Sequence, residues 1–273
     1  MRTRVGEIGE GDPVLLLHGG GGGLGHWAPL LPHLANRRLI AVERPGCGQA
    51  SRFDYAGIDL HQHACGFVGA ALDALEIDSC DLIANSMGGL WSLWFASDYP
   101  DRVNSLTLVG TPAIFPGTSA PELMLQAAGK QPPALADINP PNLEEERKKL
   151  RLTGHGDALE RGRIPPVMLN YLAALKCRPY FARDFHALIS HCIDEQGAVP
   201  GAGISLEDIA ALPQPTLVIW GERDTYGSVE QGRHVAEQMR NARFEVVPNA
   251  GHIPWLDNPE LTAGWINEFL AKV

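Results

Sequence analysis

The sequence lacks the cysteine patterns of a disulfide framework or a zinc site. Its five cysteines are an odd number, and no two of them form a C-x-x-C pair. It also lacks any apolar run near the roughly 18 residues of a membrane span. The N-terminal segment, MRTRVGEIGEGDP, has no apolar core of the kind that secretory signals carry. We therefore expect a reduced, cytoplasmic protein that does not enter a membrane.

Positive charge is scarce as well, with 22 Lys and Arg residues against 32 Asp and Glu residues and a formal net charge of -10. The one dense basic cluster, residues 147–149, directly follows three glutamates, which is the order expected for ion pairs on an exposed helix. Nucleic acid and anionic membranes are therefore poor partners, and a small molecule is the expected one. The pattern leaves a homo-oligomer open, since Leu- and Ala-rich helices could bury against a second copy.

Motifs for nucleotides and metals are missing too. The glycine run at residues 19–23 does not fit G-x-G-x-x-G with an acidic strand end about 20 residues on, and no G-K-[ST] occurs. Glu43 lies near that distance, but it leads directly into a turn, Arg44-Pro45-Gly46. His61 and His63 are two residues apart and would point to different sides of a helix. We therefore predict no cofactor and no metal.

What the sequence does contain is a regular alternation of short apolar runs with segments of helical spacing. Runs that are apolar throughout are typical of parallel strands covered on both faces. The predicted strands are Val14–Leu17, Leu39–Val42, Leu82–Ala84, Leu106–Val109, Leu217–Trp220 and Phe244–Val247. The predicted helices between and after them are 25–36, 59–77, 88–98, 230–240 and 259–272. This order predicts an α/β fold rather than separate domains.

The alternation breaks between residues 112 and 210, where prolines are frequent and no apolar strand is evident. The remaining pattern there is helical, at Leu143–Leu152, Val167–Cys177 and Tyr180–Ile193. We therefore predict a core made of residues 1–111 and 211–273, with a helical cap, residues 112–210, inserted in it. Such a cap would cover the carboxyl ends of the strands, where open α/β sheets bind ligands.

The strongest local signal for chemistry is a serine between a strand and a helix. Ser86 follows the apolar run that ends at Ala84, and Gly88 precedes a helical segment. This is close to the G-x-S-x-G turn that exposes a nucleophilic serine, with Ala84 in the first small position. The amide of Met87 would then lie at a helix N-terminus, where it can stabilise a developing oxyanion.

A second signal is the glycine run that directly follows the first predicted core strand. Glycines add no side chain to a core, but they let the backbone approach a ligand closely and adopt positive φ. At this place in the chain they suit the second half of an oxyanion hole. We expect His18, which precedes the run, to be structural.

An acid and a histidine follow the last two predicted strands. Asp224 ends the turn after Leu217–Trp220, and His252 ends the loop after Phe244–Val247. The chain order Ser, Asp, His is that of the hydrolase triad with Ser86. His252 is therefore the candidate general base, and Asp224 is the candidate acid that orients it, with Glu222 as the nearest competitor.

Three aromatic residues near these loops are candidates for a substrate pocket: His26, Trp27 and Trp255. His26 and Trp27 follow the glycine run, and Trp255 comes three residues after His252. Core packing is an equally good interpretation of Trp27 and of Trp255.

Together these motifs resemble the α/β-hydrolase superfamily over nearly the whole chain. The resemblance rests on HGGGG at 18–22, ERPGCGQAS at 43–51, ANSMGG at 84–89, GERD at 221–224 and NAGHIPWLDNPE at 249–260. It implies a mostly parallel sheet of eight strands, or of seven, with helices on both faces and a helical cap after the sixth strand. It also implies that Gly20 and Gly21 join Met87 as oxyanion donors. The short N-terminus puts the first, antiparallel edge strand in doubt.

The resemblance leaves the substrate open. Our first hypothesis is a serine esterase that hydrolyses a small carboxylic ester or lactone through an acyl-enzyme on Ser86. The alternative is a carbon–carbon bond hydrolase of a vinylogous 1,5-diketone, as in the ring-cleavage hydrolases that the glycine loop and SMGG also resemble. A carboxylate-binding arginine in the cap, Arg178 or Arg183, would favour this alternative. A third hypothesis is a ligand-binding protein on the same scaffold that turns over slowly or not at all.

Overall fold

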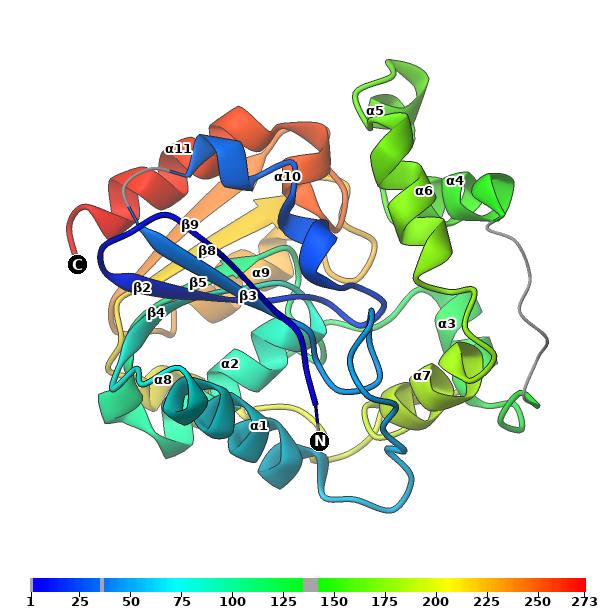
Figure 1. Cartoon of the computed structure of the whole chain (residues 1–273), viewed down its shortest axis with the longest axis horizontal. Coiled ribbons are helices and arrows are strands. Elements are labelled where there is room, and N and C mark those ends of the chain that lie inside the picture. The colour runs from blue at the N-terminus through cyan, green and yellow to red at the C-terminus, as the bar shows by residue number, and fades with distance from the viewer. Residues whose placement is uncertain (1, 35–36, 135–141) are drawn as a thin grey trace.

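A twisted, mostly parallel sheet organises the molecule (Figure 1). The computed structural model describes residues 2–34, 37–134 and 142–273. Within these residues the sheet has seven strands in the order β1-β3-β2-β4-β5-β8-β9. They are β1 (Val5–Ile8), β2 (Pro13–Leu17), β3 (Arg38–Val42), β4 (Cys80–Ala84), β5 (Val103–Val109), β8 (Thr216–Gly221) and β9 (Ala242–Val247). Only the pairing of β1 with β3 is antiparallel, so the other six strands end at the same edge.

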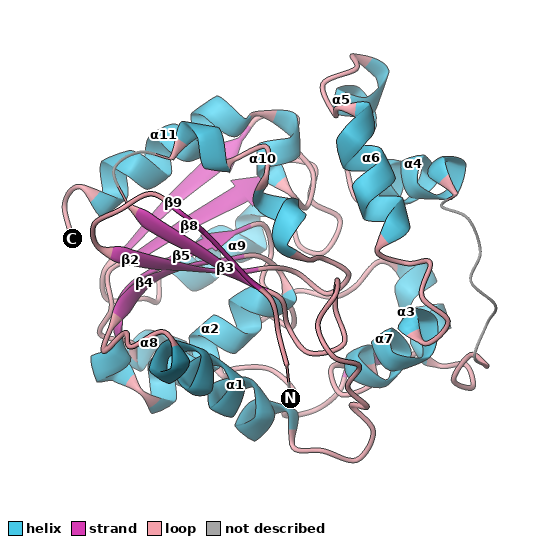
Figure 2. Ribbon diagram, viewed as in Figure 1, coloured by secondary structure: helices cyan, strands magenta, loops and turns pink. Residues whose placement is uncertain are grey.

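Helices cover both faces of this sheet (Figure 2). One face carries α1 (Leu60–Ala74), α2 (Met87–Asp98), α8 (Leu206–Ala211) and α9 (Val229–Ala236). The other carries α10 (Pro254–Asp257) and α11 (Pro259–Leu270). Side chains of β2 alternate between the two cores: Leu15 and Leu17 pack on the first face, and Val14 and Leu16 on the second. Burial on both faces explains why an inner strand such as β2 is apolar throughout.

A helical layer lies between β5 and β8 in the chain and stands beyond the carboxyl ends of the strands (Figure 1). It contains α3 (Glu122–Ala128), α4 (Leu143–Leu152), α5 (Gly156–Glu160), α6 (Pro166–Ala174) and α7 (Phe181–Ile189). A hairpin of β6 (Ile193–Asp194) and β7 (Gly197–Ala198) follows. A bidentate ion pair joins the layer to the loop after β3: Arg52 donates to both oxygens of Asp184, at 2.9 and 3.1 Å.

This layer falls inside the segment 112–210 that the sequence predicts as a cap. The division into a core, 1–111 and 211–273, and a cap stays a prediction. Residues 1, 35–36 and 135–141, which belong to the predicted ranges, lie outside the described residues.

The sheet has seven strands among the described residues, the smaller of the two numbers that the resemblance implies, and a single strand, β1, precedes β2. The helical layer follows β5, which is the fifth of these seven strands and would be the sixth in a sheet with one more strand at its beginning. The segment 112–210 also contains two short strands, β6 and β7. Each has only two residues, which is too short to produce a recognisable alternation in the sequence.

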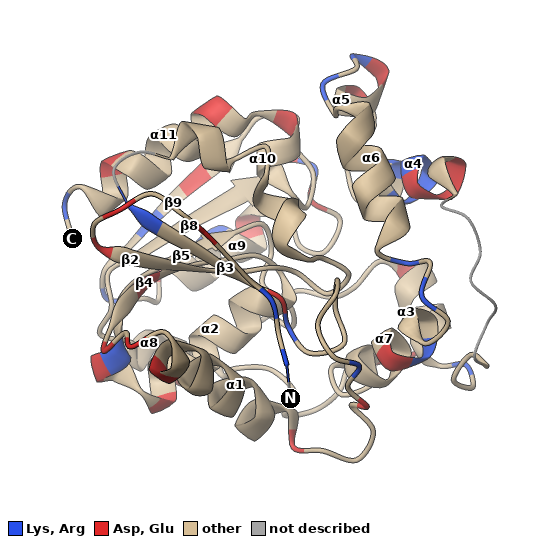
Figure 3. Ribbon diagram, in the orientation of Figure 1, with Lys and Arg blue, Asp and Glu red and all other residues tan. Residues whose placement is uncertain are grey.

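The charged cluster at residues 144–149 forms part of α4, where acidic and basic side chains follow one another (Figure 3). Arg147 pairs with Glu144 at 2.6 Å, one turn away. This confirms the i, i+3 pairing expected of the cluster. Among the described residues, none of the helices combines the length and apolarity needed to cross a bilayer.

Candidate active site

Ser86 lies in a strained turn between β4 and α2. Its backbone has φ 53° and ψ -116°, a conformation that is rare for a residue with a side chain. The turn also brings α2 against the end of β2. A Cβ on Gly88 would lie 2.1 Å from the carbonyl oxygen of Leu17, so only glycine fits there. Strand, strained turn and helix therefore occur in the order that the sequence predicts.

Asp224 and His252 meet at the same edge of the sheet, on the loops after β8 and β9. Nδ1 of His252 lies 2.9 and 3.1 Å from the two carboxylate oxygens of Asp224. Asp224 is the partner, whereas the carboxylate of Glu222 accepts a hydrogen bond from the amide of Asn249. The 27 residues between Asp224 and His252 contain α9 and β9, which return the chain to the same edge.

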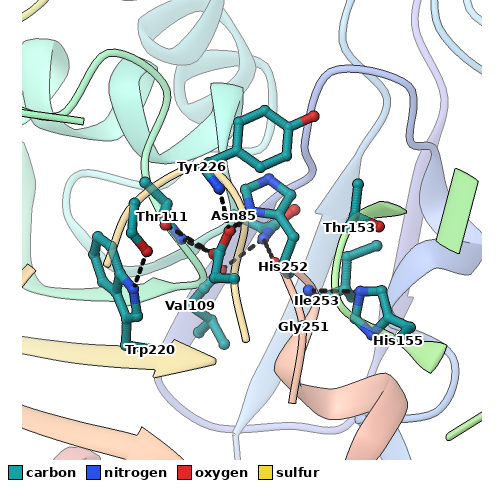
Figure 4. A network of polar contacts seen from close by, with 12 residues as sticks. Asn85, Val109, Thr111, Thr153, His155, Trp220, Tyr226, Gly251, His252 and Ile253 are labelled. Atoms are coloured by element: carbon teal, nitrogen blue, oxygen red, sulfur yellow. Dashed lines mark hydrogen bonds and ion pairs between the residues drawn. The ribbon is translucent and has the colours of Figure 1, made fainter. Parts of the chain in front are cut away.

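The carboxylate of Asp224 is held by several donors besides the histidine. The amide and hydroxyl of Thr111 donate to it at 3.0 and 2.8 Å, and the amide of Tyr226 donates at 3.0 Å (Figure 4). Burial alone would raise the pKa of Asp224, but the charge of His252 and these hydrogen bonds outweigh it and lower the pKa. Asp224 is therefore an anion that can orient His252 and stabilise it when protonated.

Two residues that the sequence analysis missed fix the position of His252. The side-chain amide of Asn85 donates to the carbonyl of Val109 at 2.6 Å and to that of His252 at 3.2 Å. Asn85 precedes Ser86, so it links the serine turn to the histidine loop. The ring of Tyr226 stacks on the imidazole with centroids 4.0 Å apart. Asn85 lies within the ANSMGG motif and Tyr226 lies in no motif, but the sequence carried no signal that either side chain contacts His252.

The glycine loop is shaped by close approach rather than by positive φ, which corrects one of our expectations. None of Gly19–Gly23 has a positive φ. Instead, a Cβ on Gly19 would lie 2.6 Å from Oδ1 of Asn85, and one on Gly22 would lie 2.5 Å from Nδ1 of His26. The loop is held from behind by the buried Arg44, whose guanidinium donates to the carbonyls of residues 18, 19 and 20.

His18 has the structural place that the sequence predicts. Its ring is fully buried, and its Nε2 accepts from the amide of Arg44 at 3.0 Å. Burial lowers the pKa of His18 well below its usual value, and the nearby charge of Arg44 lowers it further. The ring is therefore neutral, as an acceptor from a backbone amide must be.

One cavity brings the candidate residues together. Ser86 and His252 line it, as do the three candidate oxyanion donors Gly20, Gly21 and Met87. Much of the remaining wall is apolar: Pro112, Ala113, Ile114, Met124, Leu150, Leu172, Phe185, Ile189 and Ile193. An apolar cavity with a few polar groups is typical of a small-molecule site.

Of the three aromatic pocket candidates, only His26 lines this cavity. Trp27 and Trp255 are fully buried behind it and stack on each other, with centroids 4.7 Å apart. Trp27 and Trp255 are therefore core residues, and their assignment to the substrate pocket was wrong. Neither ring nitrogen of His26 has a hydrogen-bond partner among the described residues. Burial, and after it the nearby charge of His252, lowers the pKa of His26 to about 3, so the ring is neutral.

The cap wall of the cavity carries two lysines and a glutamate that the sequence analysis did not assign to the site. Lys149 and Glu146 come from α4, and Lys176 follows α6. Glu146 is buried and forms an ion pair with Lys176. Lys149 is exposed to the cavity, but enclosure by protein on its other sides lowers its pKa to about 8. The two arginines proposed as carboxylate ligands, Arg178 and Arg183, do not line this cavity.

Among the described residues, one group of side chains has the geometry to hold a metal ion: His61, Cys65 and Asp98. It lies on α1 and α2, away from the cavity, and its His61 and Asp98 already form an ion pair at 3.0 Å. His63 does not join it, because its ring stacks on Phe53 instead.

A comparison with known families agrees with this arrangement. Residues 14–265 match the model of the alpha/beta hydrolase family, and the chain belongs to that family. The fold of a meta-cleavage product hydrolase from Pseudomonas fluorescens IP01 is similar, with a TM-score of 0.78, 24% identity and coverage of 99% of this chain and 94% of that one. An enol-lactonase from Burkholderia xenovorans LB400 has a TM-score of 0.74 at 21% identity, over 99% of this chain and 96% of that one. These two likenesses concern the fold alone.

Sequence relatives extend over the whole chain. A 2-hydroxymuconate semialdehyde hydrolase from Pseudomonas sp. (strain CF600) is 30% identical over 100% of this chain and 91% of its own length. One from Pseudomonas putida is 31% identical over 99% of this chain and 91% of its own. The compound in these names has no ester or lactone bond, so its hydrolysis must break a carbon–carbon bond. Our first hypothesis, an ester or lactone hydrolase, is therefore wrong, and the relatives favour the alternative.

Proposed function

We propose that this protein hydrolyses a carbon–carbon bond in a vinylogous 1,5-diketone that carries a carboxylate, a 2-hydroxy-6-oxo-2,4-dienoate. The observation that carries the proposal is a single cavity with Ser86 and His252 on one wall and Lys149 and Lys176 on another. The first pair suits an electrophilic carbonyl, and the lysines suit an anionic end. The named activities of the full-length relatives support the same substrate class.

The charges of the cap wall favour an anionic ligand. Glu146 neutralises one lysine through its ion pair with Lys176, which leaves the ammonium of Lys149 as the surplus charge. A substrate carboxylate beside Lys149 would gain a charge-assisted hydrogen bond in an enclosed site. A neutral ester would gain nothing comparable. The ring of His26, which also lines the cavity, is neutral and adds no competing charge.

The reaction follows from the electronic structure of this substrate. When the 2-hydroxydienoate ketonises, a proton is added at C5 and a ketone forms at C2. The hydroxyl of Ser86 then adds to the C6 carbonyl while His252 takes its proton, and the amides of Met87 and of the Gly20–Gly21 loop stabilise the oxyanion. As the oxyanion collapses, the C5–C6 bond breaks and its electron pair is delocalised onto the C2 ketone.

Two products result from the subsequent steps. The first fragment takes up a proton and leaves as a 2-hydroxydienoate that is shorter by the C6 acyl group. The acyl group remains on Ser86 as an ester, which water hydrolyses while His252 accepts the proton of the water. The second product is then a carboxylic acid, and Ser86 is restored with no change in oxidation state of the protein.

The direct test compares 2-hydroxy-6-oxohexa-2,4-dienoate with p-nitrophenyl acetate. We expect a kcat/KM at least about 100-fold higher for the dienoate than for the ester, because only the dienoate has a carboxylate that can bind Lys149. Cleavage of the dienoate is measured as the loss of its ultraviolet absorbance. Ser86→Ala should reduce kcat on the dienoate by a factor on the order of 10⁶ while the protein stays folded. A kcat/KM that is higher for the ester, or an unchanged kcat in Ser86→Ala, would refute the proposal.

Lys149 offers a second test with a matched control on the same helix. Lys149→Met should raise KM for the dienoate about tenfold or more and leave KM for the ester unchanged, because a hydrogen bond to a charged group contributes about 1.5–3 kcal/mol. Lys148→Met, an exposed neighbour that does not line the cavity, should change neither value. In the native enzyme KM for the dienoate should rise above about pH 8, where Lys149 loses its charge. The same rise in Lys149→Met would contradict this role.

A further inference from the structure

The backbone that carries His252 is held at three successive amides, residues 251–253. The amide of Gly251 donates to Oδ2 of Asp257 at 3.1 Å, that of His252 to the carbonyl of Thr153 at 2.9 Å, and that of Ile253 to Nε2 of His155 at 3.2 Å. Thr153 and His155 come from the segment between α4 and α5, and Asp257 ends α10. Figure 4 shows His155 and Thr153 beside the strand of backbone that carries the histidine.

His155 and Asp257 form a second acid–histidine pair, separate from Asp224 and His252. Nδ1 of His155 lies 2.7 Å from Oδ2 of Asp257, and both side chains are buried. Because Nε2 accepts from the amide of Ile253, the proton of the neutral ring is on Nδ1, which donates to the carboxylate. Both ring nitrogens are thus engaged, and His155 does not line the cavity.

The segment 153–155 fits tightly between the two loops that carry Asp224 and His252. Gly154 has φ +93°, and a Cβ there would lie 2.2 Å from the carbonyl oxygen of Arg223 and 2.8 Å from Cα of Gly251. The preceding helix, α4, carries Lys149 on the cavity wall. One continuous piece of chain therefore contacts the acid loop, the histidine loop and the proposed carboxylate site.

We propose that His155 and Asp257 are positioning residues that fix the backbone of His252, and with it the direction of its imidazole toward Ser86. Proton transfer needs the base within hydrogen-bond reach of the serine, and a misplacement near 1 Å can reduce the rate about 100-fold. The pair supplies two of the three acceptors for the amides of residues 251–253, so its loss leaves the backbone on both sides of His252 without these hydrogen bonds. This inference rests on the proposed function only in taking His252 as the base.

The test uses His155→Asn and His155→Phe. Asparagine retains a donor toward Asp257 but has no ring nitrogen for the amide of Ile253, and phenylalanine keeps the ring shape without either hydrogen bond. We expect kcat on the dienoate to fall about 10-fold in the first and about 100-fold in the second, with KM changed less than threefold. His186→Phe, a cap histidine on α7 that does not line the cavity, is the control and should keep the native kcat.

A second measurement separates positioning from stability and from substrate choice. The rate at which a fluorophosphonate labels Ser86 reports the activation of the serine without any dienoate, and it should fall in parallel with kcat. Thermal unfolding is recorded for each variant, and if His155→Phe does not fold, His155→Asn and Asp257→Asn decide. Folded variants with native kcat and native labelling overturn the inference, as does a change confined to KM. If the native enzyme is labelled but does not cleave the dienoate, and the variants are labelled slowly, the positioning role stands and the substrate proposal fails.

Discussion

Two acid–histidine pairs lie side by side at the carboxyl edge of the sheet, and they differ mainly in what the imidazole faces. In both pairs Nδ1 of the histidine meets a buried carboxylate, at 2.9 Å in Asp224–His252 and 2.7 Å in Asp257–His155. The ring of His252 borders the cavity that Ser86 also lines, whereas Nε2 of His155 is occupied by a backbone amide. The same pair of side chains can thus serve as a base or as an anchor, depending on the partner of the second ring nitrogen.

Loss of the charge in each pair should give the largest contrast. Asp224→Asn should reduce kcat on the dienoate about 10⁴-fold, because the asparagine favours the wrong tautomer of the base. Asp257→Asn should reduce kcat only about 10- to 100-fold, because it disturbs the position of the base and not its proton. Steady-state kinetics of the two variants check this. Equal losses of kcat in the two variants would contradict the assignment of one pair to proton transfer and the other to positioning.

Truncation of the two histidines should affect stability in the opposite order, with the larger loss in the pair that contains His155. His155→Ala should lower the free energy of unfolding by about 3 kcal/mol, since it leaves the buried carboxylate of Asp257 with the amide of Gly251 as its remaining donor and the amide of Ile253 without its acceptor. His252→Ala should cost about 1 kcal/mol or less, because Asp224 keeps three donors from Thr111 and Tyr226 and the lost ring borders an existing cavity. Urea unfolding followed by circular dichroism measures both. The comparison fails if the loss in His252→Ala is as large as in His155→Ala.

The smallest expected effect concerns acid stability. The lowered pKa of Asp224 in the folded state means that its contribution is complete above the unfolded value, near 3.9, and is lost as pH falls through the folded value. Asp224→Asn should therefore lose less stability than the native protein below about pH 4, by at most about 1.4 kcal/mol per pH unit. Unfolding free energies measured between pH 5 and pH 3 test this. Parallel curves would show that Asp224 does not titrate differently in the two states.

The core of the fold was predictable because its signals are local. Each predicted core strand lies within an observed one. The inner strands were recognisable because burial on both faces makes them largely apolar, whereas β9 is a half-buried edge strand that includes Glu245. Helices α4 and α6, and α7 within a longer predicted segment, were likewise found from their spacing. The hairpin β6–β7 was not predicted, because strands of two residues leave no alternation in the sequence.

The candidate site divides in the same way. Ser86, Asp224 and His252 stand at strand ends, so chain order and turn chemistry point to them without a structure. Lys149 and Lys176 were overlooked in favour of Arg178 and Arg183, because the face that a cap helix turns to the cavity depends on how it packs. Trp27 and Trp255 were assigned to the pocket for the converse reason, since nearness in sequence to a site residue does not show which side a ring takes.

The sequence by itself determined the class of fold, the serine turn and the order of the three candidate catalytic residues, because each depends on a few neighbouring residues. Only the tertiary structure decided which cations meet the cavity and which histidine is an anchor. His155 and Asp257 are 102 residues apart in the chain. Their contact, and with it the support of the His252 loop, exists only once the cap segment packs against the carboxyl edge of the sheet.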